Sequence, residues 1–161
     1  MKSFWLAGLI AATPVLAEPV PLTTPVPGVV ESVLVKPGQR VKRGEVLLKL
    51  EPTRLAAALE VAEAEFARAE LDLADAQRDL DRAQELYART VSSTTELDAA
   101  KLRRDRAAAE GRAAQGRRTV ARKNLDDAVL RAPFGGVVKN VAAPGVTTRD
   151  CRPETLVTLE R

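Results

Sequence analysis

Two segments of nearly the same sequence lie 108 residues apart, and they constrain the fold more than any other feature of the chain. Residues 28–38 read Gly-Val-Val-Glu-Ser-Val-Leu-Val-Lys-Pro-Gly, and residues 136–145 read Gly-Val-Val-Lys-Asn-Val-Ala-Ala-Pro-Gly. Similar apolar segments follow at Leu47–Glu51 and Leu156–Glu160. Valine-rich segments that end in Pro-Gly turns are typical of β-strands. The repeat therefore predicts one small β unit that is split into two similar halves.

Residues 52–131, between the two halves, have the periodicity of helices. Large apolar residues recur every seven positions, and alanines recur three positions after them, which is a coiled-coil pattern. The first helix carries Leu59, Phe66, Leu73, Leu80 and Tyr87 with Ala62, Ala69, Ala76 and Ala83. A second helix, from about Glu96 to Val129, is predicted by the same spacing. It carries Ala100, Ala107, Ala114, Ala121 and Ala128, supplemented by Leu97, Leu102, Val120 and Leu125.

The pattern breaks at residues 90–95, which read Thr-Val-Ser-Ser-Thr-Thr. Hydroxyl side chains favour turns and helix caps, so we expect a tight turn here, with Thr95 as the cap of the second helix. The predicted fold class is therefore α+β. Two β halves, at 18–51 and 132–161, enclose a long antiparallel α-helical coiled-coil hairpin at 52–131, whose tip lies near 90–95.

The net charge of +3 conceals opposite balances in the two predicted helices. Residues 52–90 contain nine acidic and five basic residues, a balance of −4, whereas residues 95–131 contain six acidic and ten basic residues, a balance of +4. Opposite charges favour pairing of the two helices with each other and disfavour pairing of either helix with its own copy.

The N-terminal residues 1–17 predict a cleaved export signal. Lys2 supplies the positive charge, an apolar run extends from Phe4 to Ala12, and residues 15–17 (Val-Leu-Ala) fit a cleavage site. A membrane span needs about 20 apolar residues, roughly twice this run, so cleavage after Ala17 is favoured over an uncleaved anchor. Residues 18–27 contain four prolines, and we expect an extended lead-in there and not a regular strand.

The residue types argue against catalysis. The chain has no histidine and one cysteine, so imidazole bases, His-ligated or Cys-based metal sites and an intramolecular disulfide are excluded. We interpret Cys151 as a partly buried residue of a β loop. The carboxylates of Glu60, Glu63, Glu70 and Asp72 lie on the polar flanks of the heptads and are interpreted as solubilising charges. The chain is therefore predicted not to be an enzyme and to bind no cofactor and no metal.

The two β halves resemble the halves of a biotinyl/lipoyl domain. The resemblance is carried by Gly28–Leu47, which ends Val-Lys-Arg-Gly-Glu-Val-Leu, and by Arg131–Val138, which reads Arg-Ala-Pro-Phe-Gly-Gly-Val-Val. With a helical hairpin inserted between them, the chain from Pro25 to Arg161 resembles periplasmic adaptor proteins, also called membrane fusion proteins. These belong to tripartite efflux pumps and type I secretion systems. The resemblance implies a split lipoyl-like β-sandwich.

Three residues near the predicted turn match a pattern of adaptors that dock onto an outer-membrane channel. Such adaptors carry Arg, Leu and Ser spaced as R-x3-L-x6-S, and Arg82, Leu86 and Ser93 have this spacing. The resemblance implies that Arg82 donates hydrogen bonds to channel carbonyls, that Leu86 packs into a shallow groove and that Ser93 hydrogen-bonds near the turn. The alternative is that Arg82 is a solvated charge, that Leu86 extends the seam and that Ser93 is a turn residue.

The resemblance also implies a connective role in the periplasm. Copies of the β module would associate into a ring, and the hairpins would bridge an inner-membrane transporter, which supplies the energy, to an outer-membrane channel of the TolC type. Typical adaptors add a β-barrel domain and a membrane-proximal domain, which this sequence is expected to lack. The alternative function is a structural or regulatory periplasmic coiled-coil protein that assembles with other adaptors without forming a conduit.

Two other binding functions fit the sequence less well. A lipoyl or biotinyl carrier needs an exposed lysine at a turn between the halves, where this chain has the helical insert. Nucleic-acid binding is suggested by eight basic residues against two acidic ones between 103 and 123. That segment has no aromatic residue for stacking, and it follows an export signal. No nucleic-acid partner and no lipoyl or biotinyl group are predicted.

Overall fold

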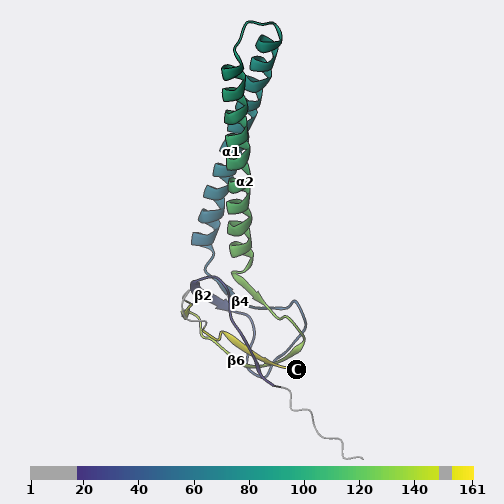
Figure 1. Cartoon of the computed structure of the whole chain (residues 1–161). Helices are drawn as coiled ribbons and strands as arrows, with labels where there is room; N and C mark the ends of the chain where they lie inside the picture. The colour runs from purple at the N-terminus through teal and green to yellow at the C-terminus, as the bar shows by residue number, and fades with distance from the viewer. Residues whose placement is uncertain (1–17, 149–153) are drawn as a thin grey trace, which may run out of the picture.

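The computed structural model describes residues 18–148 and 154–161, as a β module from which a helical hairpin projects (Figure 1). The predicted α+β class is confirmed, with a lipoyl-like β unit split around an inserted hairpin. The predicted signal peptide at 1–17 and Cys151 lie outside the described residues. No helix in the described part of the chain is long and apolar enough to cross a membrane.

The β module consists of two four-stranded antiparallel sheets, with the strand orders β1-β8-β6-β3 and β5-β4-β2-β7. The strands of the first half are β1 (Val20–Leu22), β2 (Gly28–Val33), β3 (Arg40–Val41) and β4 (Val46–Leu50). The strands of the second half are β5 (Val129–Arg131), β6 (Gly136–Val141), β7 (Thr147–Thr148) and β8 (Val157–Glu160). Each sheet thus takes two strands from each half, so the halves are interlocked.

The two halves make equivalent backbone hydrogen bonds to each other, so that the β module has an approximate twofold symmetry. In one sheet the Val30 N–H donates to the Val146 carbonyl (2.8 Å), and the Gly145 N–H donates to the Val30 carbonyl (2.8 Å). In the other, the Val138 N–H donates to the Gln39 carbonyl (2.9 Å), and the Gly38 N–H donates to the Val138 carbonyl (2.7 Å). Each Pro-Gly turn of one half therefore anchors a strand of the other half.

The core of the β module lies between the two sheets and is built from the repeated apolar positions. Its largest fully buried side chains are Leu47, Leu48, Leu50, Leu156, Leu159, Val30, Val41, Val138 and Val157. Both halves contribute equivalent residues, as Val30 and Val138 show. Because these side chains pack against one another, neither half buries its apolar residues without the other.

The expectation of an irregular proline-rich lead-in was wrong for residues 20–22. They form the edge strand β1, in which Pro21 is aligned with Thr158 of β8. Proline has no N–H to donate, but an edge strand needs donors on one side only, so it tolerates proline there. The sequence pattern of alternate prolines did not reveal that an unpaired edge of β8 was available.

The hairpin consists of α1 (Thr53–Ala88) and α2 (Thr94–Asp126), which pack along their length. At 1.5 Å per residue, α1 extends about 54 Å. The seam of the two helices follows most of the predicted seven-residue repeats. Its buried members are Ala62, Ala69, Leu80, Ala100 and Ala114. The other large residues of the α1 stripe, Leu59, Phe66 and Leu73, are partly buried.

Four residues that the periodicity assigned to the seam lie elsewhere. Tyr87, Leu102 and Val120 are exposed. Tyr87 lies in the last turn of α1, and the other two fall outside the seven-residue repeat of α2. Ala128 is buried, but in the core of the β module and not between the helices. The alanine repeat thus extended one turn beyond the actual helix.

The predicted end of the second helix and the domain boundary at 131/132 were therefore wrong. Helix α2 ends at Asp126, where the Asp127 N–H donates to Lys123 and the Ala128 N–H donates to Leu125 in a tightened last turn. Val129–Arg131 then forms β5 against β4. The local alanine pattern is compatible with a helix, but pairing with the exposed edge of β4 and burial of Ala128 favour the strand.

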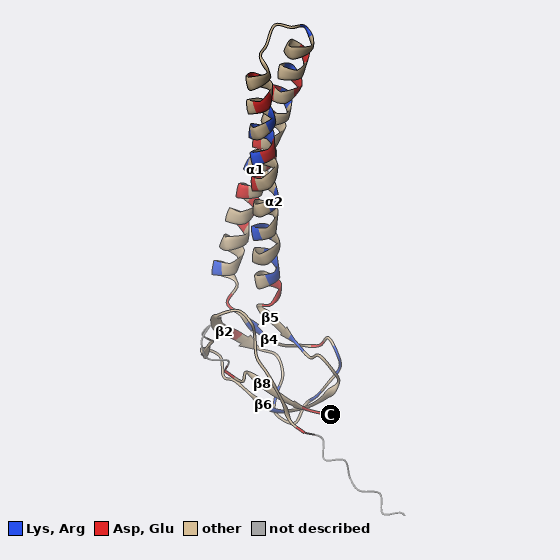
Figure 2. Cartoon of the chain, viewed as in Figure 1, with Lys and Arg blue, Asp and Glu red and all other residues tan. Residues whose placement is uncertain are grey.

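Ion pairs join the two helices, in keeping with their opposite charge balances. Figure 2 shows acidic and basic residues distributed along both helices. The Arg117 guanidinium contacts the Glu65 carboxylate at 2.9 Å, and the Arg122 guanidinium contacts the Glu63 carboxylate at 2.7 Å. Arg118 also lies over the Phe66 ring, 4.0 Å from its centroid. The two ion pairs are exposed, so each contributes at most about 1 kcal/mol and chiefly sets which faces of the helices meet.

Candidate functional site: the hairpin tip

The turn that joins the helices has the hydrogen bonds of a Schellman motif. The Val91 N–H donates to the Leu86 carbonyl (3.0 Å), and the Thr90 N–H donates to the Tyr87 carbonyl (3.0 Å). This motif requires a left-handed residue after the helix, and Thr90 occupies that place with φ of 59°. Glycine is the usual residue there, because a β-branched side chain is strained at positive φ.

Replacing Thr90 with glycine is therefore expected to stabilise the hairpin by about 1 kcal/mol, since it relieves the left-handed strain. Thermal melting followed by helix circular dichroism would measure the change. The matched control is Thr94→Gly, in the first turn of α2, where the backbone is helical and glycine should destabilise. A lower melting temperature for Thr90→Gly would show that the threonine side chain makes a contact worth more than the strain.

The sequence analysis predicted Thr95 as the cap of α2, but this was wrong, because Ser93 caps the helix. The Glu96 N–H donates to the Ser93 hydroxyl (3.2 Å), and the Ser93 N–H donates to the Glu96 carboxylate (3.1 Å), which is a capping box. The Ser92 hydroxyl donates to the same carboxylate at 2.5 Å. Thr95 lies within the first turn of the helix.

The capping hydrogen bonds lower the pKa of Glu96, chiefly through the Ser92 hydroxyl and next through the Ser93 N–H. A carboxyl whose pKa is lowered by folding stabilises the folded state while it is ionised. This contribution is lost as the pH falls through the lowered pKa. The turn at the tip is therefore held most firmly at neutral pH.

The three residues predicted to dock a channel all lie near the tip of the hairpin. Arg82 is exposed and its guanidinium contacts the Asp79 carboxylate at 3.3 Å. Leu86 is 40% exposed, one turn further along the same face of α1. Ser93 lies across the turn, where its hydroxyl serves as the cap. Arg82 and Leu86 are thus free to meet a partner, whereas Ser93 already has a structural role.

Two further apolar side chains at the tip were not assigned to a site by the sequence. Tyr87 is 43% exposed and Val91 is 73% exposed, so with Leu86 they place three large apolar residues at the end of the hairpin. Val91 was detectable as the one apolar residue in the hydroxyl-rich turn. Tyr87 could not be recognised as a tip residue from the sequence, because it continues the seven-residue spacing of the seam. Exposed apolar side chains at one end of an element are candidates for contact with another protein.

Within the described residues, no group of three or more His, Cys, Asp or Glu side chains could hold a metal ion. Four cavities line the hairpin near its base and the β module, and none of these four includes a tip residue. The tip can therefore offer hydrogen-bond donors, a cation and apolar surface to a partner.

The comparisons with known proteins agree with one another. The family model of the CzcB-like barrel-sandwich hybrid domain matches residues 19–150. Among curated proteins, the multidrug resistance protein MdtA of Cronobacter turicensis is 31% identical over 134 residues, which cover 83% of this chain and 32% of MdtA. The chain thus spans about a third of the length of that relative.

Solved structures share the fold. ZneB from Cupriavidus metallidurans has 25% sequence identity and a TM-score of 0.63, over 88% of this chain and 60% of ZneB. The membrane fusion protein Spr0693 from Streptococcus pneumoniae has 18% identity and a TM-score of 0.69, over 90% of this chain and 62% of Spr0693. At 18% identity the second likeness concerns the fold alone.

Proposed function

This chain belongs to the CzcB-like barrel-sandwich hybrid family of periplasmic efflux adaptors, and from that membership we propose that it bridges two membrane components through its hairpin. The tip docks onto an outer-membrane channel, of the TolC type, and the β module faces an inner-membrane transporter. Its role is structural and not catalytic. The transporter supplies the energy, and the transported substrate passes along the conduit that the assembly forms.

The observation that carries this proposal is the exposed apolar tip at the end of a long, self-contained hairpin. The seam of the hairpin is closed by its own two helices, so Leu86, Tyr87 and Val91 do not serve its internal packing. Arg82, one turn before Leu86, adds a planar donor that can hydrogen-bond two carbonyls at once. Apolar anchors beside an arginine are the composition that protein interfaces favour.

Ring formation completes the proposal. A conduit requires several hairpins side by side, and the β modules of neighbouring copies would supply the closed contacts. We further propose that the chain reaches the periplasm through the export signal at 1–17, with cleavage after Ala17. N-terminal sequencing of the periplasmic fraction tests this step, and an intact Met1 on the exported protein would contradict it.

Replacing Arg82 with lysine is expected to weaken capture of the channel about tenfold while leaving stability unchanged. Lysine keeps the charge and the helix propensity but loses the two-pronged donor, which is worth about 1.5 kcal/mol in a charge-assisted contact. Pull-down of the channel with the full chain, paired with thermal melting, would measure both quantities.

Arg78→Lys is the matched control, because Arg78 is equally exposed one turn earlier and also pairs with an aspartate three residues before it. It should leave capture unchanged. Equal capture by the Arg82→Lys variant and the unmodified chain would mean that the spacing match is accidental. Capture of other adaptors without any channel would instead favour a structural or regulatory protein that forms no conduit.

A further inference from the structure

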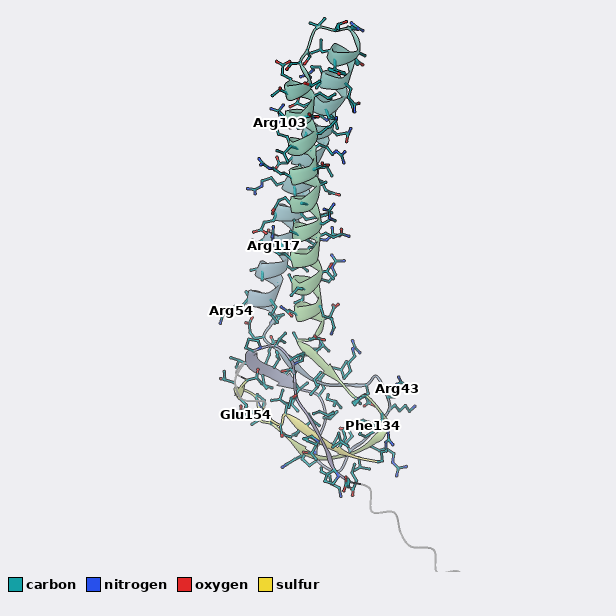
Figure 3. The ribbon with its side chains drawn as sticks, in the orientation of Figure 1. Arg43, Arg54, Arg103, Arg117, Phe134 and Glu154 are labelled. Carbon is teal, nitrogen blue, oxygen red and sulfur yellow. The ribbon has the colours of Figure 1, made fainter. Side chains whose placement is uncertain are left out.

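Arg103 is an exposed cation of α2 that forms no ion pair with a described residue. Figure 3 shows it in the half of the hairpin nearer the tip, whereas Arg117 lies nearer the β module. The guanidinium of Arg117 contacts the Glu65 carboxylate at 2.9 Å and the Glu110 carboxylate at 2.7 Å. Two arginines of one helix thus differ in whether acidic side chains hold them.

Asp79 occupies the position across the seam from Arg103. The contact between Glu65 and Arg117 joins positions that flank the seam on one side of the hairpin. Two heptads nearer the turn, Asp79 takes the place of Glu65 on α1. The same step along α2 puts Arg103 in the place of Arg117. Leu80, beside Asp79, is 3% exposed, so the two helices still share their seam at this height. Arg103 therefore has an acidic residue opposite it, as Arg117 has.

In this structure Asp79 is held by Arg82 and not by Arg103. The Arg82 Nη1 group donates to the Asp79 carboxylate at 3.3 Å, and both side chains are more than half exposed. Arg82 is also the residue that the proposed docking requires. A carboxylate is a stronger acceptor for a guanidinium than a backbone carbonyl is. The hold of Asp79 on Arg82 must therefore be weakened before Arg82 can donate to a channel.

Asp79 needs a cation, because it lies four residues after Asp75 on α1 and like charges at this spacing repel each other. Arg78, the neighbouring cation of α1, already pairs with Asp75. Once Arg82 leaves, Asp79 therefore depends on the other helix for a partner. Arg103 is the cation that the antiparallel seam places opposite it.

We propose that Arg103 is a positioning residue for docking, which takes over the Asp79 carboxylate when Arg82 turns to the channel. The proposal rests on the docking function proposed above, because a partner at the tip is what draws Arg82 away. Two arginines share one carboxylate in this arrangement, so one of them is free for a partner. Arg103 thus lets Arg82 exchange one acceptor for another without leaving Asp79 unpaired.

Nuclear magnetic resonance of the arginine Nε–Hε groups tests the exchange of partners in the free full chain. In the Arg82→Gln variant, the Arg103 signal should shift and its exchange with water should slow about threefold, because Asp79 then pairs with Arg103. Adding Asp79→Asn to this variant should return the signal to its position in the unmodified chain. An Arg103 signal that does not shift, or that shifts equally without the Asp79 carboxylate, would overturn the proposal.

Pull-down of the channel with the full chain tests the role of Arg103 in docking. Arg103→Gln is expected to weaken capture about threefold, because Arg82 then stays on Asp79. Arg103→Lys should restore capture, since lysine keeps a charge that can pair with the carboxylate. Asp79→Asn should strengthen capture about threefold and make Arg103→Gln without effect, because no carboxylate then competes for Arg82.

Arg106→Gln is the matched control, because Arg106 is also exposed on α2 and forms no ion pair with a described residue. It should leave capture unchanged, and equal losses in Arg103→Gln and Arg106→Gln would overturn the proposal in favour of an effect of net charge. A chain that captures no channel would overturn the proposed function and with it the docking role of Arg103. The Arg103 signal of the free chain would still decide whether Arg103 takes over Asp79.

Discussion

Replacing Gly136 with alanine is expected to destabilise the β module by about 3 kcal/mol or more, which is among the largest effects of a single methyl group in this chain. The new Cβ would lie 2.2 Å from the backbone carbonyl oxygen of Glu160 and 3.1 Å from its carbon. Both atoms belong to β8, whose pairing with β6 they help to define. Both are backbone atoms, so relieving the contact requires β8 to shift against β6.

Chemical denaturation of the Gly136→Ala variant would measure this loss. Gly116→Ala is the matched control, because nothing lies within 4 Å of a Cβ built there. It lies within helix α2, so alanine should stabilise the hairpin by about 1 kcal/mol. Near-normal stability of Gly136→Ala would show that β6 and β8 separate more easily than their register indicates.

The second large effect is expected for Leu80→Asp in the hairpin seam. Leu80 is 3% exposed, and aspartate there would lose the burial of the leucine side chain and place a charge between the helices. Together these changes should destabilise the hairpin by about 4 kcal/mol. Because the helices pack as a thin rod, the part of the hairpin beyond Leu80 should lose its helical structure first.

Leu71→Asp provides the matched control, with the same substitution on the opposite face of the same helix. Leu71 is 69% exposed, so its replacement should change stability by less than about 0.5 kcal/mol. Circular dichroism would record the helix content, and hydrogen exchange would locate the loss. Equal helix loss in the two variants would mean that Leu80 does not face α2.

The sequence determined the main architecture through its periodicities. A period of seven requires helices that share a seam, and the duplicated valine-rich segments require strands that form one β unit. Leu80, Ala69 and Ala100 are buried as that period predicts. The R-x3-L-x6-S spacing also drew attention to Arg82 and Leu86, which are exposed at the tip. Their docking role stays a prediction.

Local patterns were not sufficient where two structures competed for one segment. Residues 128–131 continued the alanine repeat of a helix, and residues 20–22 contained a proline. Both segments became ordered in the β module because a sheet edge was free beside them, at β4 and at β8. The choice of Ser93 over Thr95 as the cap depended on where the Schellman turn ended α1. A short stretch of sequence does not reveal the strand edge or the turn that decides each of these outcomes.

The duplicated glycines show the division between sequence and tertiary structure most clearly. Gly28 and Gly136 occupy the same place in the repeat, and the sequence alone assigns them the same role. A Cβ on Gly28 would meet the Leu50 side chain at 3.2 Å, which can shift, whereas a Cβ on Gly136 would meet the backbone of β8. The repeat determines that two similar halves form one β module. How the halves interlock decides which backbone lies against each strand, because those contacts join residues more than a hundred positions apart or on different strands.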